Sequence, residues 1–335
     1  MGAARPTLGV MLPSFAGGAS RMTSSGLREA CQEIESLGFE SIWAIDHFLP
    51  SPAYGQSWLD PLLTLSFVAA STVRVRIGTG VLVLPLRNPV LVAKEVATLQ
   101  HLSDGRFILG VGAGWNPLEF EALQVPRTER GLRSDENIDV LRLLLSGAAV
   151  RYQGSRVRFP EIAIEPMLTA PPEIWVGGGS QPAVQGSTES RRQAPDSVIR
   201  RIASADGWIS PSTSTPALIA ADWARIQSTA SAIGRDPASI TFAHMNSLHL
   251  VDTADRDKAL LDQERAFARY LGKQRAWEFA KQAYLVGSLD DVVSGIQERI
   301  RLGVRHFILG PITAQQPELN HQLRLLASRV LPALA

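Results

Sequence analysis

Apolar residues follow two different patterns along the chain. Short, nearly continuous apolar runs are typical of strands buried on both faces of a parallel sheet. Longer segments between them carry apolar residues at every third or fourth position, as on one face of an amphipathic helix. We therefore predict eight strands, at residues 7–12, 40–45, 75–84, 106–111, 173–176, 206–209, 240–251 and 305–309.

Helical segments lie between these strands, and several have recognisable ends. Gly38, Gly234 and Gly303 follow the last periodic residue of three of them, where glycine commonly ends a helix. The predicted helices span residues 23–37, 60–70, 89–103, 130–145, 197–204, 216–233, 254–271, 274–284, 289–302 and 318–331. Eight strands in alternation with helices predict a single α/β domain over residues 1–335, a (β/α)8 TIM barrel.

Insertions are predicted after the fourth, fifth and seventh strands. Residues 150–164 alternate apolar and polar positions and indicate a small hairpin, and the seventh strand is followed by two helices before the last helical repeat. Residues 181–196 are polar with little periodicity, which indicates a mobile surface insertion. A doubly wound sheet is disfavoured, because residues 110–114 do not match the GxGxxG pattern of dinucleotide-binding folds.

Composition disfavours several classes of function. The net charge of +1 indicates no electrostatic surface for nucleic acid or for an anionic membrane, and no apolar run is long enough to span a bilayer. Cys31 is the single cysteine, so disulfide scaffolds and cysteine metal clusters are excluded. No histidine pair has the spacing of a metal site. We expect a cytoplasmic protein.

Residues that follow the barrel strands are candidates for chemistry, because the carboxyl ends of parallel strands share one edge where ligands bind. His47 follows the second strand beside Asp46, so its imidazole either exchanges protons with a ligand or packs as an ordinary loop histidine. His244, on the seventh strand, is a second candidate to face the barrel interior. The residues expected to line an apolar substrate pocket are Tyr54, Trp58, Phe120 and His244.

Glycine-rich segments end three strands. Small residues around Gly80 and Val81 mark either a place where a flat ligand meets the backbone or close packing of a helix. The loop after the fifth strand suits a phosphate or simply forms a tight turn. The residues expected to bind a cofactor are Asp46 after strand two, Gly80 and Val81, and, in the loops after strands four and five, Gly114, Trp115, Asn116, Gly177, Gly178, Gly179 and Ser180.

Five segments together resemble the bacterial-luciferase-like oxidoreductases. They are SIWAIDHF at residues 41–48, GTGVLVLPLRNPVLVAKEVATLQHLSDGRFILGVGAGWNPLEF at 78–120, IWVGGGS at 174–180, ADGWI at 205–209, and VGSLDDVVSGIQERIRLGVRHFILGP at 286–311. The resemblance covers nearly the whole chain. It implies a barrel enzyme that binds reduced flavin mononucleotide (FMN) or the deazaflavin coenzyme F420 over the carboxyl ends of the strands.

The resemblance also implies roles for particular residues. It places a non-proline cis peptide at Gly80–Val81 against the cofactor ring, His47 near that ring, and the cofactor phosphate in the loop ending at Ser180. Ala113 stands where luciferases carry an arginine for the flavin phosphate, and Trp115 stands where deazaflavin-dependent sugar-phosphate dehydrogenases carry a glutamate.

Three functions follow from the resemblance. The first is a monooxygenase that uses reduced FMN, supplied by a separate flavin reductase, and O2 to oxidise a small organic substrate. The second is a deazaflavin-dependent reductase or dehydrogenase, for which a row of arginines would hold the polyanionic cofactor tail. The third is a non-catalytic cofactor-binding relative. A homodimer or higher homo-oligomer is expected. The arginines considered for the tail are Arg87, Arg127, Arg130 and Arg133.

The insertion at 181–196 is expected to act as a lid in the monooxygenase. It leaves the barrel directly after the predicted phosphate loop, and its polar composition buries little apolar surface. Arg191 or Arg192 could then supply the cation that Ala113 lacks. The alternative is a surface loop without a function in the site.

Overall fold

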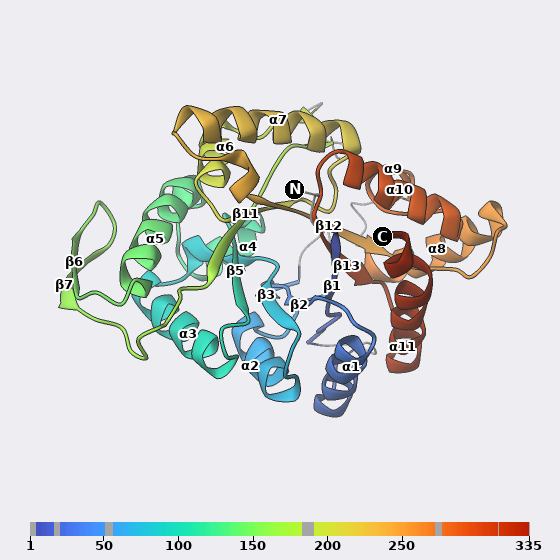
Figure 1. The fold of residues 1–335 in the computed structure, drawn as a ribbon, viewed down its shortest axis with the longest axis horizontal. Coiled ribbons are helices and arrows are strands. Elements are labelled where there is room, and N and C mark those ends of the chain that lie inside the picture. Colours follow the sequence, from blue (N-terminus) through green and yellow to red (C-terminus); the bar gives the residue numbers. More distant parts are fainter. Residues whose placement is uncertain are drawn as a thin grey trace.

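Eight parallel strands close into a barrel surrounded by helices, as the sequence predicted (Figure 1). The computed structural model describes residues 5–16, 21–50, 56–182, 191–271, 277–313 and 315–334. Within these ranges β3 pairs with both β2 and β5, which closes the ring. The barrel strands are β1 (Thr7–Met11), β2 (Ser41–Ala44), β3 (Arg76–Thr79), β5 (Phe107–Gly112), β8 (Glu173–Gly177), β11 (Gly207–Ser210), β12 (Thr241–Leu248) and β13 (His306–Pro311).

Helices cover the outer face of the barrel and begin at polar caps. The side chains of Thr23, Asp60, Asn88 and Ser288 accept hydrogen bonds from backbone N–H groups of the first helical turn. The helices are α1 (Ser24–Ser36), α2 (Pro61–Ser71), α3 (Pro89–Leu102), α4 (Pro117–Ala122), α5 (Arg130–Leu145), α6 (Asp196–Ala203), α7 (Pro216–Ala232), α8 (Arg256–Tyr270), α9 (Trp277–Ala283), α10 (Leu289–Arg301) and α11 (Gln316–Leu325).

Two predicted elements differ from the structure. The strand predicted at 75–84 is divided into β3 and the short β4 (Leu82–Val83) by a cis peptide bond between Gly80 and Val81. The helix predicted at 318–331 changes after Leu325 into a π-helical turn (Leu326–Val330) and a 3-10 turn (Leu331–Leu334). Helix α4 was not predicted, because six residues are too few to display a helical period.

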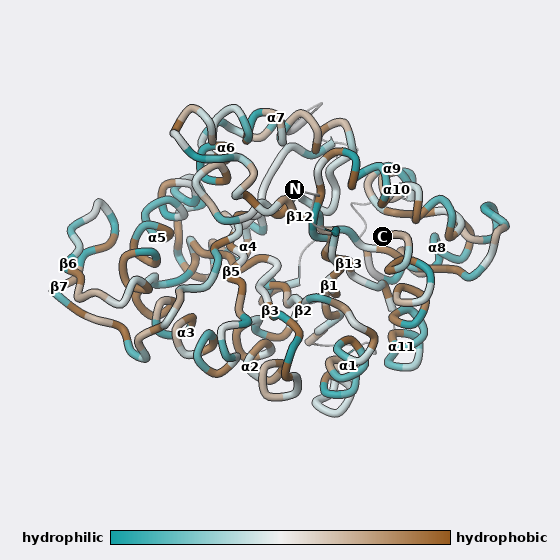
Figure 2. The backbone as a smooth tube through the Cα atoms, in the orientation of Figure 1, coloured by the Kyte–Doolittle hydropathy of each residue, from teal (hydrophilic) through white to brown (hydrophobic). Residues whose placement is uncertain are grey.

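The apolar core has an inner and an outer layer. The inner layer fills the barrel and contains Trp43 and Trp175, whose ring centroids lie 5.4 Å apart. Glycines on the facing strands leave room for them, since a Cβ at Gly78 would lie 2.5 Å from Trp43 and one at Gly207 2.6 Å from Trp175. The outer layer joins the strands to the helices, and Figure 2 shows apolar segments facing inward and polar ones outward.

The insertions are present where the sequence predicted them. The hairpin of β6 (Val150–Gln153) and β7 (Arg158–Ile162) projects from the barrel, and α8 and α9 precede α10 (Figure 1). In the segment predicted as a lid, β9 (Gln181–Pro182) pairs antiparallel with β10 (Arg191–Arg192). Residues 183–190 and the side chains of Arg191 and Arg192 lie outside the described part, so the lid stays a prediction.

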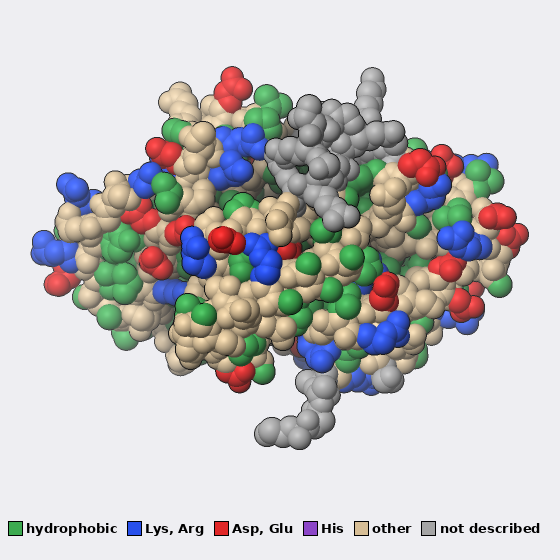
Figure 3. Space-filling model, turned by 90° about the horizontal axis from the view of Figure 1, so that it is seen from above, with side chains coloured by type: hydrophobic (Ala, Val, Ile, Leu, Met, Phe, Trp, Pro, Cys, Tyr) green, Lys and Arg blue, Asp and Glu red, His purple; other side chains and the backbone are tan. Residues whose placement is uncertain are grey.

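Charges are interspersed over the surface. On the face drawn in Figure 3, Lys and Arg side chains of the described residues alternate with Asp and Glu, which agrees with the net charge of +1. Among the described residues, no helix is long and apolar enough to cross a membrane.

Candidate active site at the carboxyl ends of the barrel strands

His47 forms a pair with Glu119 at the mouth of the barrel. Helix α4 places the Glu119 carboxylate 3.3 Å from Nδ1 of His47. Glu119 is fully buried and accepts a second, longer hydrogen bond from the Leu49 N–H at 3.4 Å. The imidazole packs edge-on to Trp115, with ring centroids 5.2 Å apart, and lies 5.8 Å from the ring of Trp58. This arrangement fixes the ring and directs Nε2 away from the carboxylate.

Asp46 does not present a free carboxylate to the mouth. Its Oδ2 accepts a hydrogen bond of 2.8 Å from the Val83 N–H, and its Oδ1 accepts one of 3.0 Å from Arg87. Arg87 also contacts Asp60. Burial alone would lower the pKa of Arg87, but the two carboxylates outweigh burial and raise it. Asp46, predicted to bind a cofactor, therefore anchors the segment that follows Gly80–Val81.

The Gly80–Val81 segment forms a small platform at the centre of the mouth. A Cβ at Gly112 or Gly177 would lie 2.5 or 2.8 Å from the Val81 side chain, so glycine at these two strand ends makes room for it. A Cβ at Gly80 would lie 2.5 Å from the terminal methyl of Met11. The small residues recognised in the sequence thus come from three neighbouring strands and meet at one place.

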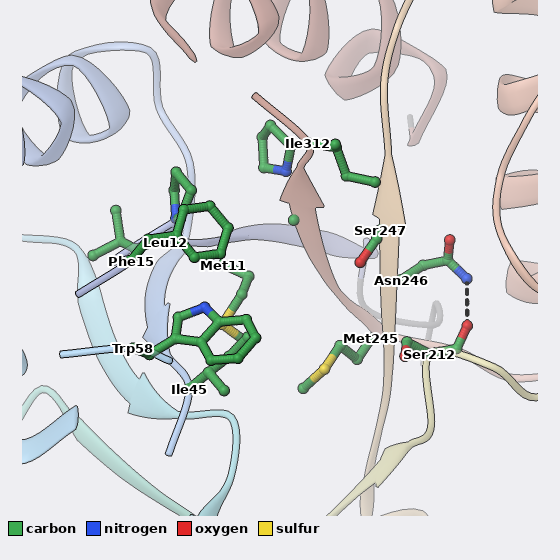
Figure 4. Close-up of a pocket in the computed structure, with 13 residues that line it drawn as sticks. Met11, Leu12, Phe15, Ile45, Trp58, Ser212, Met245, Asn246, Ser247 and Ile312 are labelled. Carbon is green, nitrogen blue, oxygen red and sulfur yellow. Dashed lines mark hydrogen bonds between the residues drawn. The ribbon is translucent and has the colours of Figure 1, made fainter. Parts of the chain in front are cut away.

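An apolar pocket adjoins this platform (Figure 4). Met11 and Met245, both beside Gly80, form part of its wall. Trp58 lines it as predicted and brings the pocket next to His47. Its remaining described lining is Leu12, Pro13, Phe15, Ile45, Ser212, Asn246, Ser247, Gly310, Pro311 and Ile312. No ionisable side chain belongs to this described lining.

The side chains of the residues that follow β5 lie in different surroundings and do not form one group. Trp115 is 37% exposed and stands beside His47. Asn116 is buried and caps α4 through the Leu118 N–H, while its Nδ2 has no hydrogen-bond partner among the described residues. Phe120 is buried against Gly114, where a Cβ would lie 3.1 Å from its ring. Phe120 supports the loop rather than lining the apolar pocket, and Tyr54 lies outside the described residues.

A buried carboxylate occupies the donors expected to hold a phosphate. Oδ1 of Asp222 accepts a hydrogen bond of 2.7 Å from the Ser180 hydroxyl, and its Oδ2 accepts from the Ser180 N–H. Trp208 donates to the carbonyl oxygen of Gly178, and a Cβ at Gly179 would lie 3.1 Å from Asp222. Both donors of Ser180 are thus engaged by Asp222, and phosphate binding by this loop stays a prediction.

His244 faces the helices and not the barrel interior. Its Nδ1 bonds to the Ser210 hydroxyl at 2.7 Å and its Nε2 accepts from Arg299 at 3.1 Å. Burial, and then the Arg299 charge, hold the pKa of His244 well below its ordinary value, so the imidazole is neutral. Its placement in the substrate pocket is therefore wrong. Strand alternation places the neighbours Ala243 and Met245 inside instead.

Arg201 is a buried cation near Ala113. A small cavity is lined by Gly112, Ala113 and Gly177 on the strand side and by Arg201 of α6 on the helix side. Arg201 is 8% exposed; its Nε donates to Asp135 at 2.6 Å, and its Nη2 to the Gly131 carbonyl.

Sequence reasoning missed Glu119, Asp222 and Arg201. Only the Asn-Pro start of α4 signalled that a helix begins before Glu119, and nothing local marked the other two. Among the described residues, no group of His, Cys, Asp and Glu side chains could hold a metal ion.

Comparisons with known proteins agree with this geometry. A family model described as luciferase-like monooxygenase matches residues 7–190, more than half of the 335 residues. The structure of a monooxygenase from Streptomyces bottropensis has a TM-score of 0.80 to this chain at 22% identity, covering 98% of this chain and 100% of that one. At this identity the likeness concerns the fold.

Curated relatives of two kinds match part of the chain. A 4-hydroxyprotoasukamycin monooxygenase of Streptomyces nodosus subsp. asukaensis is 36% identical over 36% of this chain and 31% of its own length. An F420-dependent glucose-6-phosphate dehydrogenase of Amycolatopsis mediterranei is 34% identical over 46% of this chain and 47% of its own. The chain thus spans about half the length, or less, of the curated relatives it matches.

Proposed function

The chain belongs to the luciferase-like monooxygenase family, and from this premise we propose that it uses reduced FMN and O2 to oxidise an uncharged, largely apolar organic molecule. The observation that carries the proposal is the pocket of Figure 4. Its described lining is apolar apart from Ser212, Ser247 and Asn246. The Asn246 amide points away from the pocket and bonds with Ala283 and Leu285 (Figure 4). Charged substrates would lose their hydration there without gaining a counter-charge.

The residues at the mouth fit the ring of such a cofactor. Gly80 and Val81 offer a backbone surface next to the pocket, and glycines at 112 and 177 keep that surface in place. When bound, the reduced flavin supplies the electrons that O2 needs. The apolar walls exclude water from the substrate, and Glu119 orients the His47 ring through Nδ1, so that Nε2 is the atom left to exchange a proton on the side away from Glu119.

Arg201 is our candidate for the cation that holds the cofactor phosphate. Arg201 lines the same small cavity as Ala113, which stands at the position where luciferases carry an arginine. The donors of Ser180, by contrast, are engaged by the carboxylate of Asp222. Arg201 pairs with Asp135, whose side chain is 46% exposed. The ion pair is thus in contact with solvent on the Asp135 side, where water can solvate this carboxylate if a phosphate takes its place.

A deazaflavin-dependent dehydrogenase is the second candidate. The His47–Glu119 pair supports it, because a proton acceptor beside the pocket is what oxidation of an alcohol requires. The arginines considered for the polyanionic tail support it less. Arg87 binds Asp46 and Asp60, and Arg133 binds Glu129 at 3.0 Å, so both charges are already paired.

Titration of the purified protein with reduced FMN and with F420, both reduced and oxidised, under anaerobic conditions tests the proposal. We expect tighter binding of FMN, and oxygenated product when O2 and an apolar substrate are admitted. Tighter binding of F420 with hydride transfer would establish the second candidate. Binding of a cofactor without turnover of any substrate would indicate a non-catalytic relative.

A matched pair of variants tests the phosphate cation. Arg201→Met should weaken FMN roughly tenfold or more and leave riboflavin, which has no phosphate, unchanged. Arg200→Met, on the exposed side of the same helix, should change neither the affinity for FMN nor the affinity for riboflavin. Equal weakening of FMN and riboflavin by Arg201→Met would remove Arg201 from the phosphate site.

A further inference from the structure

A second cavity lies outside the barrel, among the helices that follow β12. It has a volume of about 440 Å³ and is lined by residues of α8, α9 and α10, the loop after α9, and the first residue of α7. It shares no lining residue with the apolar pocket at the mouth. The six residues that matter here are Arg256, Lys281, Leu285, Asp291, Glu298 and Arg299.

Arg299 is a buried cation that no carboxylate of the described residues contacts. It is 4% exposed, its Nε donates to Nε2 of His244 at 3.1 Å, and its Nη1 donates to the Gly295 carbonyl at 2.9 Å. Within the described residues no carboxylate lies in ion-pair contact with it, although Glu298 raises its pKa against the larger lowering by burial. A buried charge with no counter-charge is costly, and a guanidinium keeps its proton.

Glu298 is the carboxylate that acts on Arg299, from a distance and without an ion-pair contact. His244, to which Arg299 donates a hydrogen bond, is neutral. Asp291 is engaged by Arg256 at 3.2 Å and by the Ser288 N–H at 2.9 Å in the capping box of α10. Of the three cations in the lining, Arg256 pairs with Asp291 and Lys281 pairs with Glu278 at 2.7 Å, so Arg299 is the one that no carboxylate of the described residues contacts.

Gly295 and Arg299 line the cavity from adjacent turns of α10. A Cβ at Gly295 would lie 2.8 Å from Leu285, so glycine makes room for the Leu285 side chain, and it would lie 3.5 Å from Nη1 of Arg299. Glycine therefore adds no side chain between the cavity and the guanidinium.

We propose that this cavity is a binding site for a small oxyanion, a phosphate or carboxylate group, held by Arg299 with Lys281 at its rim. A guanidinium binds both groups through paired N–H donors. The site lies behind the wall of the apolar pocket. Asn246, which lines that pocket, accepts from the Leu285 N–H at 2.9 Å and donates to the Ala283 carbonyl at 3.2 Å.

Calorimetric titration of the cofactor-free, full-length protein with inorganic phosphate and with acetate, at constant ionic strength, tests the proposal. We expect saturable binding of at least one of the two anions. Arg299→Gln should weaken it roughly tenfold or more, and Arg301→Gln, an exposed residue of the same helix, should leave it within about twofold. The Arg201→Met variant should also retain it, which separates this site from the proposed cofactor phosphate site.

A second pair of variants keeps the test decisive if Arg299→Gln fails to fold. Lys281→Met should weaken binding about threefold, whereas Lys258→Met, an exposed lysine of α8 outside the cavity, should have no effect. The absence of saturable binding would overturn the proposal. The proposal would also be overturned if Arg299→Gln and Arg301→Gln lowered the affinity for the anion equally. A loss of anion affinity in Arg201→Met alone would overturn it too.

Discussion

At the scale of single residues, the pair of His47 and Glu119 is the feature on which activity should depend most. Glu119 is completely buried, so its carboxylate orients the imidazole without contact with the apolar pocket. It is a positioning residue, and His47 is the group that faces the mouth. The position that Trp115 occupies lacks a carboxylate, and α4 supplies one from four residues further along the chain.

Glu119→Gln should lower kcat roughly 10- to 100-fold and leave KM and cofactor affinity nearly unchanged, because an amide keeps the shape but not the charge. Glu121→Gln, on the exposed face of the same short helix, is the control and should change none of these. Steady-state kinetics and cofactor titration of the three proteins decide the matter. A parallel loss of kcat and folding stability would indicate a purely structural role.

At the scale of elements, the platform depends on how the ends of three strands fit together. Gly112 ends β5, Gly177 ends β8, and the side chain of Val81 occupies the space that both leave. Asp46 at the end of β2 ties the following segment down through Val83 and Arg87.

Gly112→Ala should weaken cofactor binding roughly tenfold, because the added Cβ would lie 2.5 Å from Val81 and push it toward the ring position. Ala232→Val, at an exposed position near the end of α7, is the control and should leave cofactor affinity unchanged. Fluorescence titration with the cofactor measures both. Unchanged affinity in Gly112→Ala would mean that the ring does not rest on this platform.

At the scale of the whole molecule, the barrel closes where the first and last strands meet, and His306 lies at that seam. From β13 it bonds to Thr7 of β1 at 2.6 Å and to Ser41 of β2 at 2.9 Å. Burial, with a smaller contribution from Arg76, lowers the pKa of His306 from 6.5 to about 3. The imidazole is thus neutral in the folded protein.

Acid should therefore weaken the fold through His306. Between pH 6.5 and about 3 the unfolded chain binds a proton that the folded chain does not, so the free energy of unfolding falls as pH falls. One such proton contributes about 1.4 kcal/mol per pH unit, and His244 acts in the same direction. Urea unfolding at pH 7 and at pH 5 measures the effect. The free energy of unfolding should fall less between these two pH values in His306→Asn than in the wild type. His101→Asn, at an exposed position, is the control and should show the same pH dependence as the wild type. If His306→Asn also kept the wild-type pH dependence, His306 would not be a cause of the acid destabilisation.

Much of the fold follows from periodicity that is local in the chain. The runs at 106–111 and 173–176 became β5 and β8 within a residue, and the predicted helix at 130–145 has the same bounds as α5. Apolar runs and helical spacing are set by neighbouring residues, so the sequence alone determined the barrel and its insertions. The glycine-rich segments likewise indicated where the platform of Gly80 and Val81 lies.

Only the tertiary structure decided which side chains face one another. Glu119 meets His47 across 72 residues, Asp222 meets Ser180 across 42, and Arg299 meets His244 across 55. No local pattern relates such partners, because their contact depends on how separate strands and helices are stacked around the ring. The same stacking turned His244 outward and placed Asp222 on the expected phosphate donors. The sequence thus determined where the site is, and the packing of distant elements determined which charges and hydrogen bonds the site contains.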